Sequence, residues 1–234
     1  MGRVKINPQE LYVYLRKNLN LCVTDNGLIY LHNNGRWGKI SSREFKAIIK
    51  AHLPVISRTK SQIEAVYYEI VETDYFGISE DDFDSDEKII NFSNGIYNIH
   101  SEELLPHEPK YLSTIQIPCD FVAGLTWDNA PNFSKFVQDM FGDDYATRDF
   151  FLQFCGAVIS NIKGSRYKKM LMMVGDGNTG KSLALKLVME LIGRENCVSM
   201  DFKKMGERFG TAPLYGKRLN KCCHAMLHFM SKPL

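Results

Sequence analysis

Several features are scarce in this sequence of 234 residues, and each absence narrows the classes of protein to which it can belong. No stretch approaches the roughly 18 uncharged apolar residues that a membrane-spanning helix needs. Residues 1–5 are not followed by the apolar block of a secretory signal. We therefore expect a cytoplasmic protein with no membrane-embedded part.

Paired cysteine spacing is also missing. The six cysteines are scattered, which is typical of reduced thiols rather than of a disulfide framework. Cys222 and Cys223, with His224 and His228 close behind, form the one cluster that suggests zinc. No second ligand pair stands at the spacing of a zinc finger, so we favour a core or unstructured tail there.

Carboxylates are missing from the last part of the chain, because residues 208–234 contain no Asp or Glu. Residues 1–159 carry 15 Lys and Arg against 22 Asp and Glu, whereas residues 160–234 carry 14 against 5. The basic part should attract the phosphates of a nucleotide or of a nucleic acid. Two oppositely charged lobes that attract each other would give the same pattern, and charge alone leaves both open.

The first 75 or so residues predict a compact module of helices and short strands. Asn7 followed by Pro8 marks a helix start. Strands are expected around residues 22–24, 28–32 and 36–40, separated by turns that contain Asn and Gly. Two helices should follow, each opened by a capping box, Ser41-x-x-Glu44 and Ser61-x-x-Glu64.

Residues 80–87 contain six acids. A calcium loop is excluded because its sixth position would be Glu87, where Gly is required, and its twelfth Ser93, where Glu is required. A pair of carboxylates for magnesium, as in a primase, lacks a flanking apolar strand to fix its geometry. We interpret the segment as a solvated, flexible connector.

The middle of the chain predicts a hairpin over residues 89–99, an extended segment over 105–122, and two amphipathic helices. The helices carry apolar stripes at helical spacing, which we assign to the core rather than to a surface that stacks bases. The stripes are Phe133, Phe136, Val137, Met140 and Phe141, then Phe151, Leu152, Cys155, Val158 and Ile159.

Residues 175–182 match the pattern G-x-x-x-x-G-K-[ST], between an apolar segment at 168–174 that predicts a strand and an apolar segment at 183–192 that predicts a helix. This context is typical of the phosphate-binding P-loop (Walker A motif) of nucleotide-binding proteins, and a fortuitous glycine-rich turn is the alternative. The candidate ATP-binding residues are Gly175, Asp176, Gly177, Asn178, Thr179, Gly180, Lys181 and Ser182.

Each residue type in this loop has a chemical reason. Gly175, Gly177 and Gly180 allow successive backbone N–H groups to face a phosphate, and the dipole of the following helix favours the negative charge. Lys181 is expected to contact the β- and γ-phosphates, and it is our one candidate catalytic residue. Ser182 is expected to ligate magnesium through its hydroxyl.

Hydrolysis of ATP needs carboxylates beside the loop, normally at the end of a neighbouring strand. The candidate strand begins at residues 217–220 and contains no acid. The last carboxylates, Asp201 and Glu207, belong to the polar segment ahead of it. The sequence therefore predicts nucleotide binding and leaves turnover open.

Together with the loop, residues 91–99 (NFSNGIYNI), 104–109 (LLPHEP) and 207–220 (ERFGTAPLYGKRLN) resemble the phage/plasmid primase-helicase family. That family includes the poxvirus primase-helicase and superfamily III helicases of prophages. The resemblance implies an AAA+-like ATPase that forms a homo-oligomeric hexamer. It also implies action on single-stranded or origin DNA, with replication-protein partners, during replication initiation.

The sequence departs from this family after residue 220, where the expected acidic strand and arginine finger are replaced by residues 221–234. We expect a chain truncated before its hydrolytic machinery. The predicted fold class is α/β: a small α+β domain with the acidic connector (1–88), a hairpin and helical region (89–160), and a partial P-loop AAA+-like NTPase domain (161–234).

Two functions of different classes fit these observations. The first is an ATP-binding helicase-class replication protein, impaired in hydrolysis. The second is a non-enzymatic module that binds DNA or a full-length helicase and modulates it. A small nucleotide kinase is disfavoured, because such enzymes begin with the phosphate loop whereas most of this chain precedes it.

Overall fold

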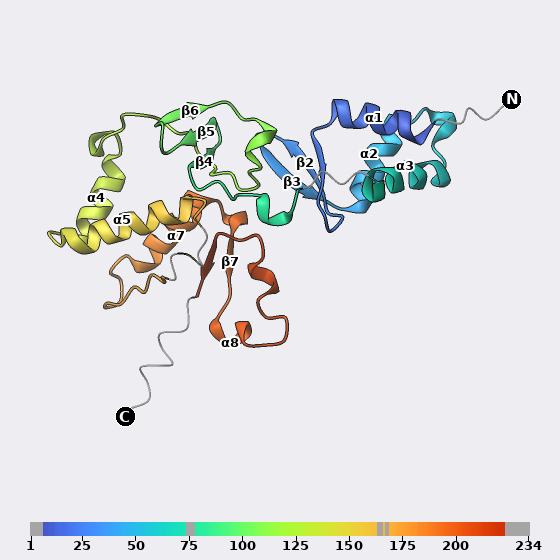
Figure 1. Ribbon diagram of the computed structural model, residues 1–234. Helices are drawn as coiled ribbons and strands as arrows, with labels where there is room; N and C mark the ends of the chain where they lie inside the picture. The colour runs from blue at the N-terminus through green and yellow to red at the C-terminus, as the bar shows by residue number, and fades with distance from the viewer. Residues whose placement is uncertain (1–6, 74–77, 163–165, 167–168, 223–234) are drawn as a thin grey trace. The chain divides into compact units, whose positions relative to one another are not determined.

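The computed structural model describes residues 7–73, 78–162, 166 and 169–222, and they form a mixture of helices and small sheets (Figure 1). The chain divides into two compact units. Unit 1 comprises Met1–Asp86 and His107–Ile115, and unit 2 comprises Glu87–Pro106 and Gln116–Leu234. The mixed helix and sheet content agrees with the expected α/β class.

Unit 1 combines an antiparallel sheet of order β1-β2-β3 with three helices, of which α3 packs against both α1 and α2 (Figure 1). Its core gathers apolar side chains from these helices and from β1 and β2. The elements are α1 Pro8–Asn18, β1 Leu21–Val23, β2 Ile29–Asn33, β3 Arg36–Ile40, α2 Ser42–His52, η1 Val55–Ser57, α3 Lys60–Thr73, η2 Glu80–Asp82 and η3 Pro109–Tyr111.

The three expected strands of unit 1 form within a residue or so of their predicted bounds. The β2–β3 hairpin turns through Asn34 and Gly35, whose φ angles are 50° and 79°. This two-residue turn with both φ values positive matches the twist of antiparallel strands, and it favours Asn-Gly. Gly35 is required for a second reason, since a Cβ there would lie 2.6 Å from the ring of His107.

Two of the three predicted helix starts are confirmed, and the third is wrong. The Asn7 side chain accepts a hydrogen bond from Gln9 N, and both bonds of the Ser41–Glu44 capping box are present. The next helix begins at Lys60, so Ser61 lies inside it. Thr59 supplies the cap, because its hydroxyl accepts from the N–H of Gln62 at 3.3 Å.

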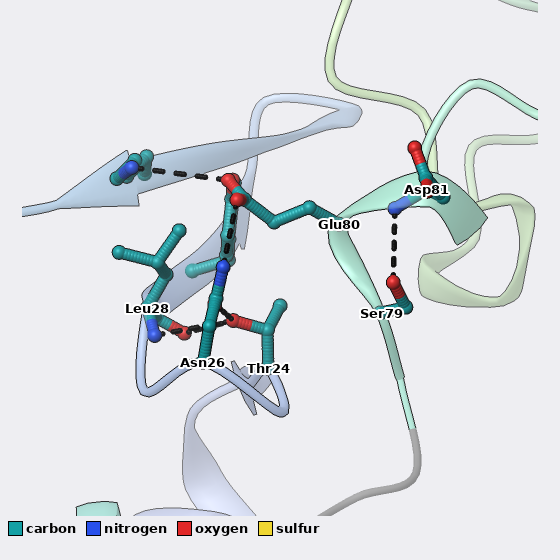
Figure 2. Close-up of polar contacts among 8 residues, drawn as sticks. Thr24, Asn26, Leu28, Ser79, Glu80 and Asp81 are labelled. Carbon is teal, nitrogen blue, oxygen red and sulfur yellow. Dashed lines mark hydrogen bonds and ion pairs between the residues drawn. The ribbon is translucent and has the colours of Figure 1, made fainter.

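The acidic segment lies at the boundary between the two units, and half of its acids are exposed as expected of a solvated connector. It is nevertheless anchored on unit 1, which corrects the expectation that it is flexible. The Glu80 carboxylate accepts a hydrogen bond from Asn26 Nδ2 at 2.9 Å (Figure 2). It accepts another from the Tyr30 hydroxyl, also at 2.9 Å. Phe83 is buried, and its ring stacks on that of Tyr30 with centroids 4.4 Å apart. The sequence predicted charge here and missed the aromatic anchor between the acids.

Asp84 joins the acidic segment to a segment without regular secondary structure about thirty residues later in the chain. Its carboxylate accepts hydrogen bonds from the backbone N–H groups of Thr114 and Ile115 at 2.9 and 3.3 Å, and from the Ser113 and Thr114 hydroxyls. Asp84 itself has a positive φ of 50°, which Asp tolerates better than most residues. This carboxylate therefore holds residues 113–115 in unit 1.

Unit 2 contains a meander of order β4-β5-β6, a set of helices and a parallel pair of strands, β7 and β8. Its core includes buried residues of α5 and α7 together with residues of β4. The elements are β4 Ile89–Phe92, β5 Gly95–Asn98, β6 Glu103–Leu105, η4 Trp127–Asn129, α4 Pro131–Phe141, α5 Tyr145–Ile159, α7 Lys181–Ile192, η5 Arg194–Asn196, β7 Cys197–Ser199, α8 Phe202–Met205, η6 Ala212–Leu214 and β8 Leu219–Lys221.

The hairpin and the two amphipathic helices expected in this part of the chain are present as β4–β5, α4 and α5. Val137 is buried on α4, and Phe151, Cys155 and Val158 are buried on α5. The core role assigned to these four positions is therefore confirmed. Burial also raises the pKa of the Cys155 thiol to about 11, which keeps it protonated at neutral pH.

The strand expected before the phosphate loop does not form in the part of the chain that the structure describes. Residues 169–174 pair with no described strand, although Leu171 and Met173 pack on the core while Met170, Met172 and Val174 are exposed. Alternation of this kind is typical of a strand, but a strand also needs a neighbour to take its backbone hydrogen bonds. The strand prediction is corrected for this reason.

The capping box of α2 yields a first prediction. Ser41→Ala should lower the free energy of unfolding of unit 1 by about 1 kcal/mol, because it leaves the N–H of Glu44 without its hydroxyl acceptor. Urea unfolding can be followed through Trp37, which lies in unit 1, in a Trp127→Phe background. Ser61→Ala is the matched control and should change stability by less than about 0.5 kcal/mol. Equal effects of the two substitutions would contradict the assignment.

Asp84 yields a second prediction. Asp84→Asn keeps the shape of the side chain but removes the charge that two N–H groups and two hydroxyls share, so unit 1 should lose about 1–3 kcal/mol of stability. The same urea experiment measures it. Asp25→Asn makes an identical change of charge at an exposed carboxylate that bonds to no described group, and it should be near neutral. If the free energy of unfolding is unchanged in Asp84→Asn, the Asp84 carboxylate does not hold residues 113–115 in place.

Candidate functional site

The loop that matches the phosphate-binding pattern lies directly before α7. Gly180 is the N-cap of that helix, with φ 82° and ψ −4°, and Asn178 also has a positive φ of 62°. The Thr179 hydroxyl donates to the carbonyl of Asp176 at 3.0 Å, which closes the turn. The helix expected after the loop is thus present, and its first N–H groups face the end of the loop.

The loop positions occupied by glycine differ in whether their backbone conformation requires glycine. At Gly180 the backbone is left-handed, so any side chain there would be strained. Gly177 has no positive φ, and a Cβ there would meet no atom within 4 Å. Gly175 also has a positive φ, of 156°, that L side chains rarely adopt. The expectation that glycine is needed at Gly175, Gly177 and Gly180 is therefore supported by the loop geometry at Gly175 and Gly180, and not at Gly177.

Lys181 directs its ammonium group back into its own loop. Nζ donates to the carbonyl of Gly175 at 2.9 Å, to the Thr179 hydroxyl at 2.8 Å, and to the carbonyl of Asp176. These three oxygens lie around one positive charge at the N-terminus of a helix. A cation held at this point by weak neutral acceptors can exchange them for the stronger acceptors of an anion.

The remaining candidate residues of the loop lie at its surface. Ser182, the second residue of α7, is exposed, and its hydroxyl bonds to no described group. Asp176 is exposed in the turn. The structure thus places the lysine inside the loop, while the serine hydroxyl and the helix N–H groups remain accessible.

The strand where hydrolytic carboxylates were expected carries none. β8 consists of Leu219, Asn220 and Lys221, paired in parallel with β7. Of the two nearest acids before it, Asp201 caps α8 by accepting from the N–H of Lys204, and Glu207 precedes the η6 turn. The described residues therefore give the loop no carboxylate from β8.

Residues 217–220 hold β8 against the rest of unit 2 through side-chain hydrogen bonds. The Arg218 guanidinium donates to the carbonyl of Ser160 and to Asn161 Oδ1, both at 2.7 Å, at the end of α5. Asn220 accepts from the N–H of Met200 and donates to its carbonyl, at 3.0 and 3.1 Å. These residues, which contributed to the family resemblance, bind β8 to the rest of unit 2.

No group of three or more His, Cys, Asp or Glu side chains in the described ranges could hold a metal ion. The cluster that suggested zinc lies mostly outside those ranges, since Cys223, His224 and His228 are not described. No helix among the described residues has the length and apolar character that a membrane span requires.

Comparison with protein-family models matches residues 11–142 to a family described as D5 N terminal like. The chain belongs to this family. The match spans more than half of the chain and identifies a D5-like primase-helicase protein, in agreement with the family inferred from the sequence motifs. No curated protein matches the chain significantly.

The match to the D5 family ends at residue 142, before the loop at residues 175–182. It therefore covers unit 1 from residue 11 onward, β4–β6 and α4, and it connects the chain with phage and viral DNA replication. The assignment of the loop itself depends on its sequence pattern and its geometry.

One contact at the loop was missed by sequence reasoning. A Cβ placed on Gly180 would lie 3.8 Å from Cε2 of Phe136, so this ring of α4 lies against the N-terminus of α7. Phe136 was assigned to a core stripe from its helical spacing. Nothing in the sequence signals that a residue 44 positions before Gly180 contacts it.

The glycine geometry yields a third prediction. Gly180→Ala should destabilise unit 2 by about 1–2 kcal/mol because it forces a side chain into the left-handed region, whereas Gly177→Ala should be close to neutral. Differential scanning calorimetry of the full chain measures both. A Gly177→Ala protein that is less stable than Gly180→Ala would show that the loop has a different conformation.

Proposed function

We propose that this D5-family protein binds ATP with magnesium through residues 175–182 and acts as a helicase-class replication protein on single-stranded DNA. The observation that carries the proposal is the position of Lys181, whose ammonium is gathered by three oxygens of its own loop at the start of α7. A lysine in this place supplies positive charge where the helix dipole already favours phosphate.

The chemistry of the loop fits a nucleoside triphosphate. The N–H groups at the start of α7 and the Lys181 ammonium are donors for phosphate oxygens, and the exposed Ser182 hydroxyl is a suitable ligand for magnesium. The magnesium ion would neutralise charge between the β- and γ-phosphates. The candidate residues Gly175, Asp176, Gly177, Asn178 and Thr179 would surround the phosphates mainly through their backbone.

Action on DNA is proposed from two further observations. Membership of the D5 family supports a role in phage or viral DNA replication. The basic character of residues 160–234 suits a polyanion. Assembly into a homo-oligomeric ring, with single-stranded or origin DNA and other replication proteins as partners, belongs to the same proposal.

A second function is favoured by one specific observation, the lack of any carboxylate on β8. A P-loop without a neighbouring acid can hold ATP, but it lacks the group that orders magnesium and water for attack. On this basis the chain would be a non-enzymatic module that binds DNA or a helicase partner and modulates it.

The proposal is tested by Lys181→Ala. Isothermal titration calorimetry with magnesium and ATP should show affinity lowered by about 10- to 100-fold, since hydrogen bonds from a charged donor are lost. The control is Lys186→Ala, which removes the same charge from an exposed position on the same helix and should leave affinity unchanged. If the wild-type chain does not bind ATP in this experiment, the proposal is wrong.

Measurement of turnover separates the two functions. ATP hydrolysis by the wild-type chain, stimulated by single-stranded DNA and lost in Lys181→Ala, supports the helicase-class protein. ATP binding without turnover, with or without DNA, supports the binding module.

A further inference from the structure

A pocket lies beside the N-terminal turn of α4 in unit 2. It is a shallow, largely open depression of ≈ 290 Å³, and no charged side chain lines it. An uncharged, partly aromatic lining suits a flat apolar or heteroaromatic group and disfavours a phosphate. The lining residues are Leu125, Thr126, Trp127, Ala130, Phe133 and Leu152.

Two of the lining residues begin a row of aromatic rings. The rings of Trp127 and Phe133 are parallel to within 6°, with centroids 5.8 Å apart, and Phe133 is followed by Phe136 at 6.5 Å. Trp127 is nevertheless 47% exposed. With nearly half of its surface uncovered, the indole keeps area on which another planar ring can stack.

The row ends at the phosphate loop. Phe136 lies against Gly180, the N-cap of α7, because a Cβ placed there would be 3.8 Å from Cε2 of the ring. Gly180 in turn precedes Lys181, the phosphate-contacting candidate. The helices involved, α4, α5 and α7, lie together in Figure 1, with α5 packed against both α4 and α7.

The length of this row is comparable with that of a nucleotide. The ring contacts place Phe133 up to about 10 Å and Trp127 up to about 16 Å from Gly180. The ribose and α-phosphate that join a base to its β-phosphate span roughly 7–8 Å at bond lengths of about 1.5 Å, and a purine extends roughly 5–6 Å beyond the ribose. A nucleotide with its phosphates at the start of α7 can therefore place its base beside Phe133 and Trp127.

We infer that the pocket at Trp127 and Phe133 binds the purine base of the nucleotide whose phosphates the loop at residues 175–182 holds. The inference rests on the proposed function and adds the base-binding subsite to it. The base stacks on the exposed indole, and Leu125 and Leu152 cover its edges. The two ends of the nucleotide are bound by different interactions: charged groups bind the phosphates, and apolar ring contacts bind the base.

The experiment compares two ligands that share the phosphate tail, ATP and inorganic tripolyphosphate, each titrated calorimetrically with magnesium into the full chain. Trp127→Ala removes the stacking surface, and Trp127→Phe keeps a smaller one. Phe150→Ala is the matched control, because Phe150 is an equally exposed aromatic residue of α5 that does not line the pocket.

We expect Trp127→Ala to weaken ATP binding by about 5- to 100-fold, the range found when a stacking aromatic is removed, and to leave tripolyphosphate binding unchanged. Trp127→Phe should retain most of the ATP affinity, and Phe150→Ala all of it. Unchanged tripolyphosphate binding also shows that the Trp127→Ala protein is folded.

The outcomes separate this inference from the proposed function. If ATP and tripolyphosphate both bind, but Trp127→Ala affects neither, the base lies elsewhere and the pocket serves another occupant, such as an apolar side chain of a partner protein. If neither ligand binds to the wild-type chain, the proposed function fails first. A loss of both ligands in Trp127→Ala alone would mean that Trp127 only supports the loop, which also overturns the inference.

Fluorescence supplies a second readout. The chain contains two tryptophans, and Trp37 belongs to unit 1. Stacking of the base should quench the emission of Trp127, so ATP should quench the wild-type chain and tripolyphosphate should not. The ATP-dependent quenching should disappear in Trp127→Phe even where binding persists. Equal quenching by the two ligands would contradict base stacking.

Discussion

The candidate site depends on one positive charge, the ammonium of Lys181, and on the loop oxygens that surround it. Those oxygens are the backbone carbonyls of Gly175 and Asp176 and the hydroxyl of Thr179, so a single side chain orients two carbonyl groups and one hydroxyl of the loop. The left-handed backbone of Gly180 brings this loop to the first turn of α7. The ammonium charge, the loop and the positive end of the helix dipole thus all lie at the N-terminus of α7. Such an arrangement is the physical basis of anion binding at a helix N-terminus.

The basic residues of unit 2 divide into two roles. Arg218 and Lys217 donate to carbonyl oxygens of Ser160 and Glu195, so their charge stabilises the join between β8, α5 and η5. Lys181 donates to its own loop, and Lys203 and Lys204 lie on the exposed α8. A positive net charge in this part of the sequence is therefore partly structural, and exposed lysines such as Lys203 and Lys204 are the ones accessible to a polyanion.

Sequence reasoning succeeded where the cause of a structure lies within a few residues. The cap at Asn7, the box at Ser41 and the turn at Asn34-Gly35 are each fixed by local backbone chemistry, and all three are present. It failed where the partner is distant: Asp84 meets residues 113–115, and Phe136 meets Gly180. Ser61 shows a further limit, since two hydroxyls close in sequence competed for one helix start and Thr59 supplied the cap.

The same distinction explains the segment before the loop. Alternating exposure of residues 169–174 follows from their sequence, but a strand is a property of two segments and no described segment pairs with this one. The loop and α7 need no such neighbour, because a helix satisfies its own backbone hydrogen bonds. The loop and α7 can therefore form even though the described residues show no strand paired with the segment before the loop.

Family membership and loop chemistry describe different parts of the chain, and the contact of Phe136 with Gly180 connects them. The D5 match includes Trp127, Phe133 and Phe136 and ends before the loop, which holds Lys181. If the base is bound by the aromatic row and the phosphates by the loop, neither part alone has full affinity for ATP. Nucleotide binding would then couple the family-matched region to α7, so that α4 and α7 are held together most firmly when both ends of the nucleotide are engaged.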